Sequence, residues 1–267
     1  MITLTRCLSL AICLNLPTLT SAHEFWIEPG GYQVEPGEEI TADLKNGENF
    51  SGINLSYIDR NIARFDIAMA DEVAPVEGRM GDRPALKLSA NRSGLLVVLH
   101  ETTPSSLTYK TWDKFQTFAD HKDFPDIRAR HDARGLPEVD FKEDYTRHAK
   151  ALIAVGDGSG SDRAFGLQTE LVALTNPYSP NFTGDMQVAL FYDGAVRPDA
   201  QVEVFERAPD DTVTVSLYRT DKGGEATVPV KPGHDYLFDA VVLRPAPGET
   251  EAVWETLWAA LTFSVPE

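Results

Sequence analysis

Apolar and polar residues alternate in short runs along most of the chain, and turn residues separate these runs. Residues 39–44 (EITADL) alternate as a half-buried β-strand does. Residues 94–100 (GLLVVLH) are continuously apolar, which is typical of a central strand buried on both faces. Asn46-Gly47 predicts a turn. Further strands are expected at 53–58, 64–69, 85–89, 167–174, 186–192, 201–205, 212–218, 225–230, 236–243 and 254–265.

The middle of the chain has a different periodicity. Trp112, Phe115, Phe118 and Ala119 recur at helical spacing, and a second short helix is expected between Pro125 and Gly135. Residues 140–155 are predicted to form an amphipathic helix. The positions that predict this helix are Phe141, Tyr145, Ala149 and Leu152, and a Gly/Ser tract at 158–161 follows it as a linker.

These patterns predict an all-β fold of two β-sandwich domains, Ig-like or prealbumin-like, with a helical insertion between them. We expect the N-terminal domain at 23–110, the helical insertion and linker at 111–165, and the C-terminal domain at 166–267.

Residues 1–22 have the three parts of a secretory signal peptide. Arg6 supplies positive charge, residues 7–16 form a short apolar run, and Thr20-Ser21-Ala22 places small residues before a cleavage site. The predicted cut lies between Ala22 and His23, and the expected destination is the periplasm. No other stretch has the length and apolarity of a transmembrane segment.

Charge and cysteine content narrow the possible partners. Both cysteines lie in the signal, so the processed chain would contain none. Cleavage removes one of the 24 basic residues and leaves 23 against 41 acidic ones, a formal charge of −18. Such a charge repels phosphate backbones, and no nucleic acid is expected as a partner. Cations are the natural counter-ligands, although a diffuse acidic surface also serves solubility alone.

His23 is the first candidate for metal binding. After cleavage it would carry a free α-amine beside an imidazole, and both nitrogens bind metals near neutral pH. Such donors suit Ni, Co, Cu or Zn, so a transition-metal ion is the expected cofactor. The alternative interpretation is that His23 is merely an exposed first residue.

His100 and His148 are the candidates for completing the metal site. His100 ends the apolar run at 94–100, where sites often form at a strand tip, and His148 lies on the predicted amphipathic helix. The alternative interpretation is a satisfied or solvent-facing edge histidine for His100 and a packed helix residue for His148. The remaining histidines, His121, His131 and His234, are expected to be solvated.

Other site chemistries find little support. The chain has no pair of histidines four residues apart, no Gly-x-Ser-x-Gly elbow and no phosphate-binding glycine loop. We therefore expect a non-enzymatic protein, with an oxidative copper enzyme as a lesser alternative.

Four motifs, found in this order along the chain, resemble one known family. They are His23-Glu24-Phe25-Trp26-Ile27-Glu28-Pro29, the stretch NGENF at 46–50, DYTRHAKAL at 144–152 and WETLWAALTF at 254–263. The family is an uncharacterised periplasmic domain family that has been labelled the periplasmic component of nickel or cobalt uptake transporters. The strand pair with its Gly-rich turn at 200–224 resembles carboxypeptidase-regulatory or prealbumin-like modules.

The resemblance implies export, a β-sandwich followed by a regulatory-type β domain, and a role with transition metals through His23. The sequence thus predicts a periplasmic protein that binds or delivers a transition-metal ion. The alternative is a metal-free accessory module that binds a transporter or outer-membrane receptor component.

Overall fold

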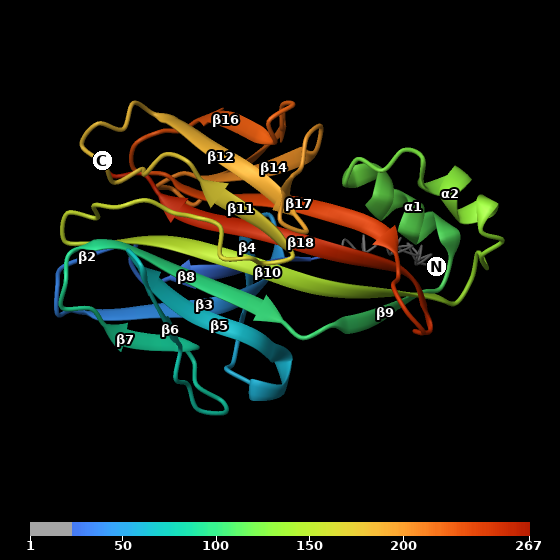
Figure 1. Ribbon diagram of the computed structural model, residues 1–267, viewed down its shortest axis with the longest axis horizontal. Coiled ribbons are helices and arrows are strands. Elements are labelled where there is room, and N and C mark those ends of the chain that lie inside the picture. The colour runs from blue at the N-terminus through green and yellow to red at the C-terminus, as the bar shows by residue number, and fades with distance from the viewer. Residues whose placement is uncertain (1–22) are drawn as a thin grey trace, which may run out of the picture.

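The computed structural model describes residues 23–267, so the predicted signal peptide lies outside the described residues. Strands form three sheets in stacked layers, and two short helices cover one end of the central sheet (Figure 1). The predicted all-β sandwich with a small helical insertion is confirmed. Within residues 23–267, no helix has the length and apolarity needed to span a membrane.

The central sheet has ten strands and contains strands from both halves of the chain. Its long strand β10 (Phe141–Val155) pairs parallel with β18 and antiparallel with β8, and thereby joins the two halves. The order is β15 (Val213–Arg219), β14 (Gln201–Arg207), β17 (Asp235–Pro245), β18 (Ala252–Ser264), β10, β8 (Gly94–Thr102), β5 (Ile62–Met69) and β6 (Glu72–Pro75), with β2 (Gln33–Val34) and β9 (Ser105–Tyr109) also pairing with β10.

One smaller sheet lies on each face of the central sheet. The first contains β1 (Glu24–Pro29), β3 (Glu39–Glu48), β4 (Ser51–Leu55) and β7 (Leu86–Ser89). The second contains β11 (Thr169–Ala173), β12 (Asp185–Tyr192), β13 (Ala195–Val196) and β16 (Glu225–Pro229).

The prediction of a helix at 140–155 was wrong, because this segment is strand β10. Its alanines and leucine favour a helix locally, but tertiary packing overrides such propensities. Ala149, Ala151 and Ile153 face the core under β1 and β3, whereas Leu152 and Ala154 face the opposite core. A strand buried on both faces reads as an apolar run without a polar stripe, and periodicity alone does not separate it from a buried helix.

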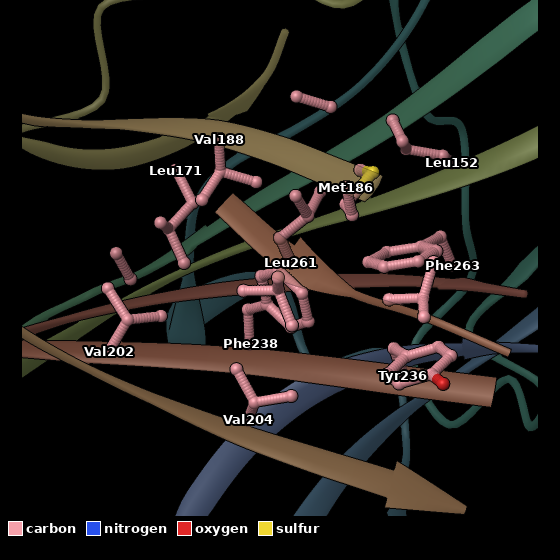
Figure 2. Close-up of a cluster of buried hydrophobic side chains, with 14 of the residues drawn as sticks. Leu152, Leu171, Met186, Val188, Val202, Val204, Tyr236, Phe238, Leu261 and Phe263 are labelled. Carbon is pink, nitrogen blue, oxygen red and sulfur yellow. The ribbon is translucent and has the colours of Figure 1, made fainter. Parts of the chain in front are cut away.

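The core between the central sheet and the β11–β12–β13–β16 sheet is the larger of the two inter-sheet cores. Figure 2 shows Leu171, Met186 and Val188 of the outer sheet facing Leu261 and its neighbours on the central strands. Tyr236 stacks on Phe263 at a ring-centroid distance of 5.3 Å. Burial of these side chains removes apolar surface from water, the main favourable term in folding.

Helices α1 (Trp112–His121) and α2 (Ile127–Ala133) confirm the first part of the predicted insertion. A one-turn 3-10 helix also occurs at Asp59–Asn61. Val241 of β17 packs under the helices, and Leu237, on the same face of that strand, packs under β1 and β3. The helices and the β1–β3–β4–β7 sheet therefore cover the same face side by side, with a junction between them.

The turn expected at Asn46-Gly47 was misplaced, because both residues belong to β3. The chain turns three residues later than predicted, where Asn49 and Phe50 have φ values of 51° and 57°, as a two-residue type I′ hairpin requires. Gly47 is needed for another reason, since a Cβ there would lie 2.0 Å from the carbonyl oxygen of Ser51 on β4.

Candidate functional site

His23 lies at the junction between the β1–β3–β4–β7 sheet and the helices, immediately before β1. The antiparallel register pairs Glu24 with Gly47, which brings Glu48 opposite His23. Nε2 of His23 lies 3.3 Å from Oε1 of Glu48, and the His23 side chain is 54% exposed. The ring is therefore accessible from solvent while a carboxylate faces one of its two nitrogens.

Arg147 of β10 fixes the main chain of His23. Its guanidinium donates a hydrogen bond to the His23 carbonyl oxygen. The guanidinium also lies over the rings of Tyr145 and Trp258, at 5.1 and 5.0 Å from the centroids, an arrangement of cation–π type. The start of the described chain is thus held against the central sheet.

Arg147 is 9% exposed, and burial lowers the pKa of its guanidinium. Within residues 23–267, no carboxylate oxygen lies within 4.0 Å of the Arg147 guanidinium, the limit for an ion pair. Asp239, Glu24 and Glu143 lie further away and oppose the lowering of the Arg147 pKa. A buried cation without a paired anion is costly. Such a residue is a candidate for binding an anion from outside the chain.

Two cavities adjoin Arg147. One, of about 390 Å³, lies between β1, the β3–β4 hairpin, β8 and the start of β9. The other, of about 330 Å³, lies between β9, α1 and β10, and His23 lines it. Asn46, Tyr145 and Arg147 line both cavities, so these residues form the partition between them.

His100 and His148 do not share a site with His23. His100 packs between Phe25 and Phe65, with ring centroids at 5.2 and 5.0 Å, and burial lowers its pKa to about 3. It faces the same core as those two residues.

His148 belongs to the set of β10 residues that faces the opposite side of the sheet, together with Leu152 and Ala154. Its Nδ1 lies 3.1 Å from the Trp258 carbonyl oxygen, and burial lowers its pKa to about 4. In the described part of the chain, no three His, Cys, Asp or Glu side chains are grouped as ligands for one metal ion. Within residues 23–267, any metal bound by His23 therefore has no further cluster of these side chains to complete its coordination.

The remaining histidines have different surroundings. His121 is half-exposed, with Nε2 2.7 Å from Oε1 of Glu203. The prediction that His131 is solvated was wrong, because its side chain is fully buried. Trp254 Nε1 donates to His131 Nδ1 at 3.0 Å, so Nε2 carries the proton and donates to the Pro137 carbonyl oxygen.

A family model described as a domain of unknown function (DUF4198) matches residues 20–244. The chain belongs to the DUF4198 family. A search of curated proteins found no match. The matched solved structures include the D0-D1 domain of intimin, with 12% identity over 89% of this chain and 97% of that chain, at a TM-score of 0.20.

The Yersinia pseudotuberculosis adhesin InvE also matches, with 11% identity over 91% of this chain and 58% of that chain, again at a TM-score of 0.20. The DUF4198 chain thus spans little more than half of the InvE chain. Neither likeness carries an argument about this protein's function.

The DUF4198 chain also buries a charged cluster at the junction, which the sequence analysis missed. Lys122, directly after α1, donates to Glu203 of β14, to Asp239 of β17 at 3.1 Å and to Glu24 of β1 at 3.3 Å. Burial raises the pKa of Glu24 to about 7, and Lys122 opposes that shift. The cluster connects the helices, the β1–β3–β4–β7 sheet and the central sheet.

Arg147 was also missed as a site residue. The available signal was the presence of charged residues, such as Glu143, Arg147 and Lys150, within a strongly apolar segment. Lys150 is paired with Asp162 at 2.7 Å and Glu170 at 3.1 Å and is explained as structural. Only the contacts in three dimensions separate it from Arg147.

Proposed function

We propose that this DUF4198 protein is exported to the periplasm and binds or delivers a transition-metal ion through His23. In the processed chain, the α-amine and Nδ1 of His23 would chelate the ion together. The observation that carries the proposal is the 3.3 Å separation between His23 Nε2 and Glu48 Oε1.

The position of Glu48 favours one tautomer of the His23 ring. A carboxylate beside Nε2 accepts a hydrogen bond from Nε2–H, and Nδ1 then keeps its lone pair free. Metal-binding histidines commonly donate their second ring N–H to a carboxylate in this way, which fixes the tautomer and increases the basicity of the ligand nitrogen. Nδ1 is the nitrogen that shares a six-membered chelate ring with the α-amine.

The main-chain anchor supports the same proposal. Because Arg147 binds the His23 carbonyl oxygen, the first residue of a processed chain would lose less conformational entropy on binding a metal. Amine and imidazole nitrogens suit Ni(II), Co(II), Cu(II) and Zn(II), with Cu(II) expected to bind most tightly. Nickel or cobalt as the physiological ion is supported only by the family resemblance of the sequence.

The proposal is tested by calorimetric titration of the chain that begins at His23 with each of the four ions. The matched control carries one glycine before His23, which moves the free amine away from the ring and leaves the rest of the protein unchanged. We expect one-to-one binding of micromolar or tighter affinity that the added glycine weakens at least a hundredfold. Equal binding by both proteins would overturn the N-terminal site. Mass spectrometry of the exported protein tests the cut itself.

A second candidate function, a metal-free accessory module, has support from the edge of the central sheet. Strand β15 lies at that edge, and its Leu217 side chain is 61% exposed, with Val215 also exposed. Unpaired edge strands with apolar side chains can add a strand from a partner. A transporter or outer-membrane receptor component that co-purifies with the protein, and is lost with Leu217→Lys, would favour this function.

A further inference from the structure

We propose that the 390 Å³ cavity between β1, the β3–β4 hairpin, β8 and β9 binds a small organic carboxylate with an apolar body, and that Arg147 binds the carboxylate group. His23 does not line this cavity, so the proposal does not require a metal ion at His23, although Arg147 contacts both sites. The cavity differs from the second cavity, which adjoins His23 and has Glu143 in its wall.

The charge of the cavity wall is opposite to that of the whole protein. The chain carries a formal net charge of −17, yet the wall contains Arg83 and Arg147 and neither aspartate nor glutamate. A cavity lined by one sign of charge within low-dielectric walls attracts ligands of the opposite sign. The wall therefore selects anions, which the rest of the surface repels.

Arg147, which lines this cavity, has unused hydrogen-bonding capacity. A guanidinium has five N–H donors in a planar fork, and the hydrogen bond to the His23 carbonyl oxygen is the one that Arg147 makes through its side chain within the described residues. The fork matches the two oxygens of a carboxylate, and a charge-assisted pair of this kind is stronger than a neutral hydrogen bond. A bound carboxylate would supply an anion at hydrogen-bond distance, whereas Asp239, Glu24 and Glu143 act on Arg147 only from beyond ion-pair distance.

Two further polar groups of the wall have no partner. His100 is 1% exposed, and both of its ring nitrogens are buried without a hydrogen bond. Oδ1 of Asn46 is also buried without a hydrogen bond. Nearly all buried polar groups in folded proteins are hydrogen-bonded, and these exceptions belong to residues that line the cavity. A neutral imidazole offers one donor and one acceptor.

The rest of the wall sets the shape of the ligand. Phe25, Leu44, Leu55 and Ile62 contribute apolar surface, and small-molecule sites typically span about 300–1,000 Å³. An inorganic anion would leave this surface unused. A ligand with an aromatic or aliphatic body of about six to ten carbon atoms fits the size and apolar wall.

Arg83 marks the entrance. It is exposed and donates to Ser56 Oγ at 3.0 Å, so its charge lies at the rim while Arg147 lies at the partition. A rim charge chiefly increases the association rate, whereas a buried one determines affinity. We therefore expect substitution of Arg83 to change mainly the association rate and substitution of Arg147 to change mainly the affinity.

The test is calorimetric titration with sodium benzoate and sodium octanoate beside their uncharged amides, using the glycine-extended control chain so that N-terminal metal binding plays no part. We expect each carboxylate to bind at least tenfold more tightly than its amide. Arg147→Lys keeps the charge but removes the fork, and should weaken carboxylate binding at least tenfold. Arg83→Gln should weaken it about threefold and lower the association rate, and the exposed, non-lining Arg79→Gln should have no effect.

A second variant avoids the arginines. Ser105→Trp fills the cavity from exposed strand β9 and should abolish carboxylate binding without affecting Cu(II) binding by the processed chain. Equal affinity for acids and amides, no binding of either acid, or unchanged binding by Arg147→Lys would overturn the proposal. Displacement of octanoate by an equal concentration of inorganic phosphate would overturn the requirement for an apolar body. The carboxylate titrations can fail without affecting the metal proposal, because that proposal is tested by comparing Cu(II) binding of the processed chain and the glycine-extended chain.

Discussion

The guanidinium of Arg147 donates a hydrogen bond to the main-chain carbonyl oxygen of His23, a residue 124 positions earlier in the chain. The bond joins the residue before β1 to the middle of β10 at the point where two cavities meet. The same arginine therefore positions the proposed metal ligand and lines the proposed carboxylate site.

Removing the carboxylate of Glu48 should weaken metal binding by the processed chain. Glu48→Leu leaves His23 Nε2 without its partner, and loss of such supporting contacts typically costs about 10–100-fold in metal affinity. Glu48→Gln should recover part of the loss because its carbonyl oxygen still accepts a hydrogen bond. Calorimetry with Cu(II) measures the effect, and Glu39→Leu at the far end of β3 is the control. Unchanged affinity in Glu48→Leu would contradict a role for Glu48.

Lys122→Met should destabilise the fold strongly at pH 8. The variant leaves Glu24, Glu203 and Asp239 buried without their cation, and breaking a buried ion pair typically costs about 3–5 kcal/mol. The loss should shrink at pH 5.5, because Glu24, whose folded pKa is about 7, is then protonated and uncharged. Urea unfolding at both pH values measures the difference, with Lys114→Met on α1 as control. A loss that is equal at both pH values would argue against this account.

His100→Phe should flatten the acid side of the stability profile. The folded pKa of His100 is about 3, whereas the unfolded value is about 6.5, so below pH 6.5 the unfolded state binds a proton that the folded state rejects. The contribution of neutral His100 is thus complete above pH 6.5 and is lost as the pH falls towards 3. The native chain should lose stability relative to the variant by up to about 1.4 kcal/mol per pH unit. Urea unfolding of both proteins from pH 7 to 4.5 measures this difference. If the free energy of unfolding changes equally with pH in the two proteins, the account is refuted.

Gly47→Ala should destabilise the β3–β4 hairpin. An added Cβ would meet the Ser51 carbonyl oxygen at 2.0 Å and the Gly52 Cα at 2.4 Å, both of which are backbone atoms. Overpacking of this kind typically costs about 1–3 kcal/mol. Asn49→Gly, at φ 51°, should be neutral or slightly stabilising because glycine tolerates that conformation. Thermal unfolding compares the two, and a neutral Gly47→Ala would mean that the strands separate at little cost.

The sequence by itself determined the fold class and most strands. Runs such as 94–100 and 236–243 predict strands through their alternating or continuous apolar residues. Strands β8 and β17 lie at these positions. It also pointed to Trp112, Phe115 and Phe118 as one face of a helix, which is α1. These are local signals, because neighbouring residues alone produce them.

Only the tertiary structure decided the identity of β10 and the composition of the site. Residues 141–155 favour a helix locally, and pairing with β8 and β18 makes them a strand. As a consequence, His148 turns away from His100, and Arg147 meets His23 across 124 residues. Whether a buried cation has a partner depends on which distant segments pack against it. The spacing of residues along the chain does not reveal such partners. Lys150 and Arg147 therefore look alike in sequence and differ in the folded protein.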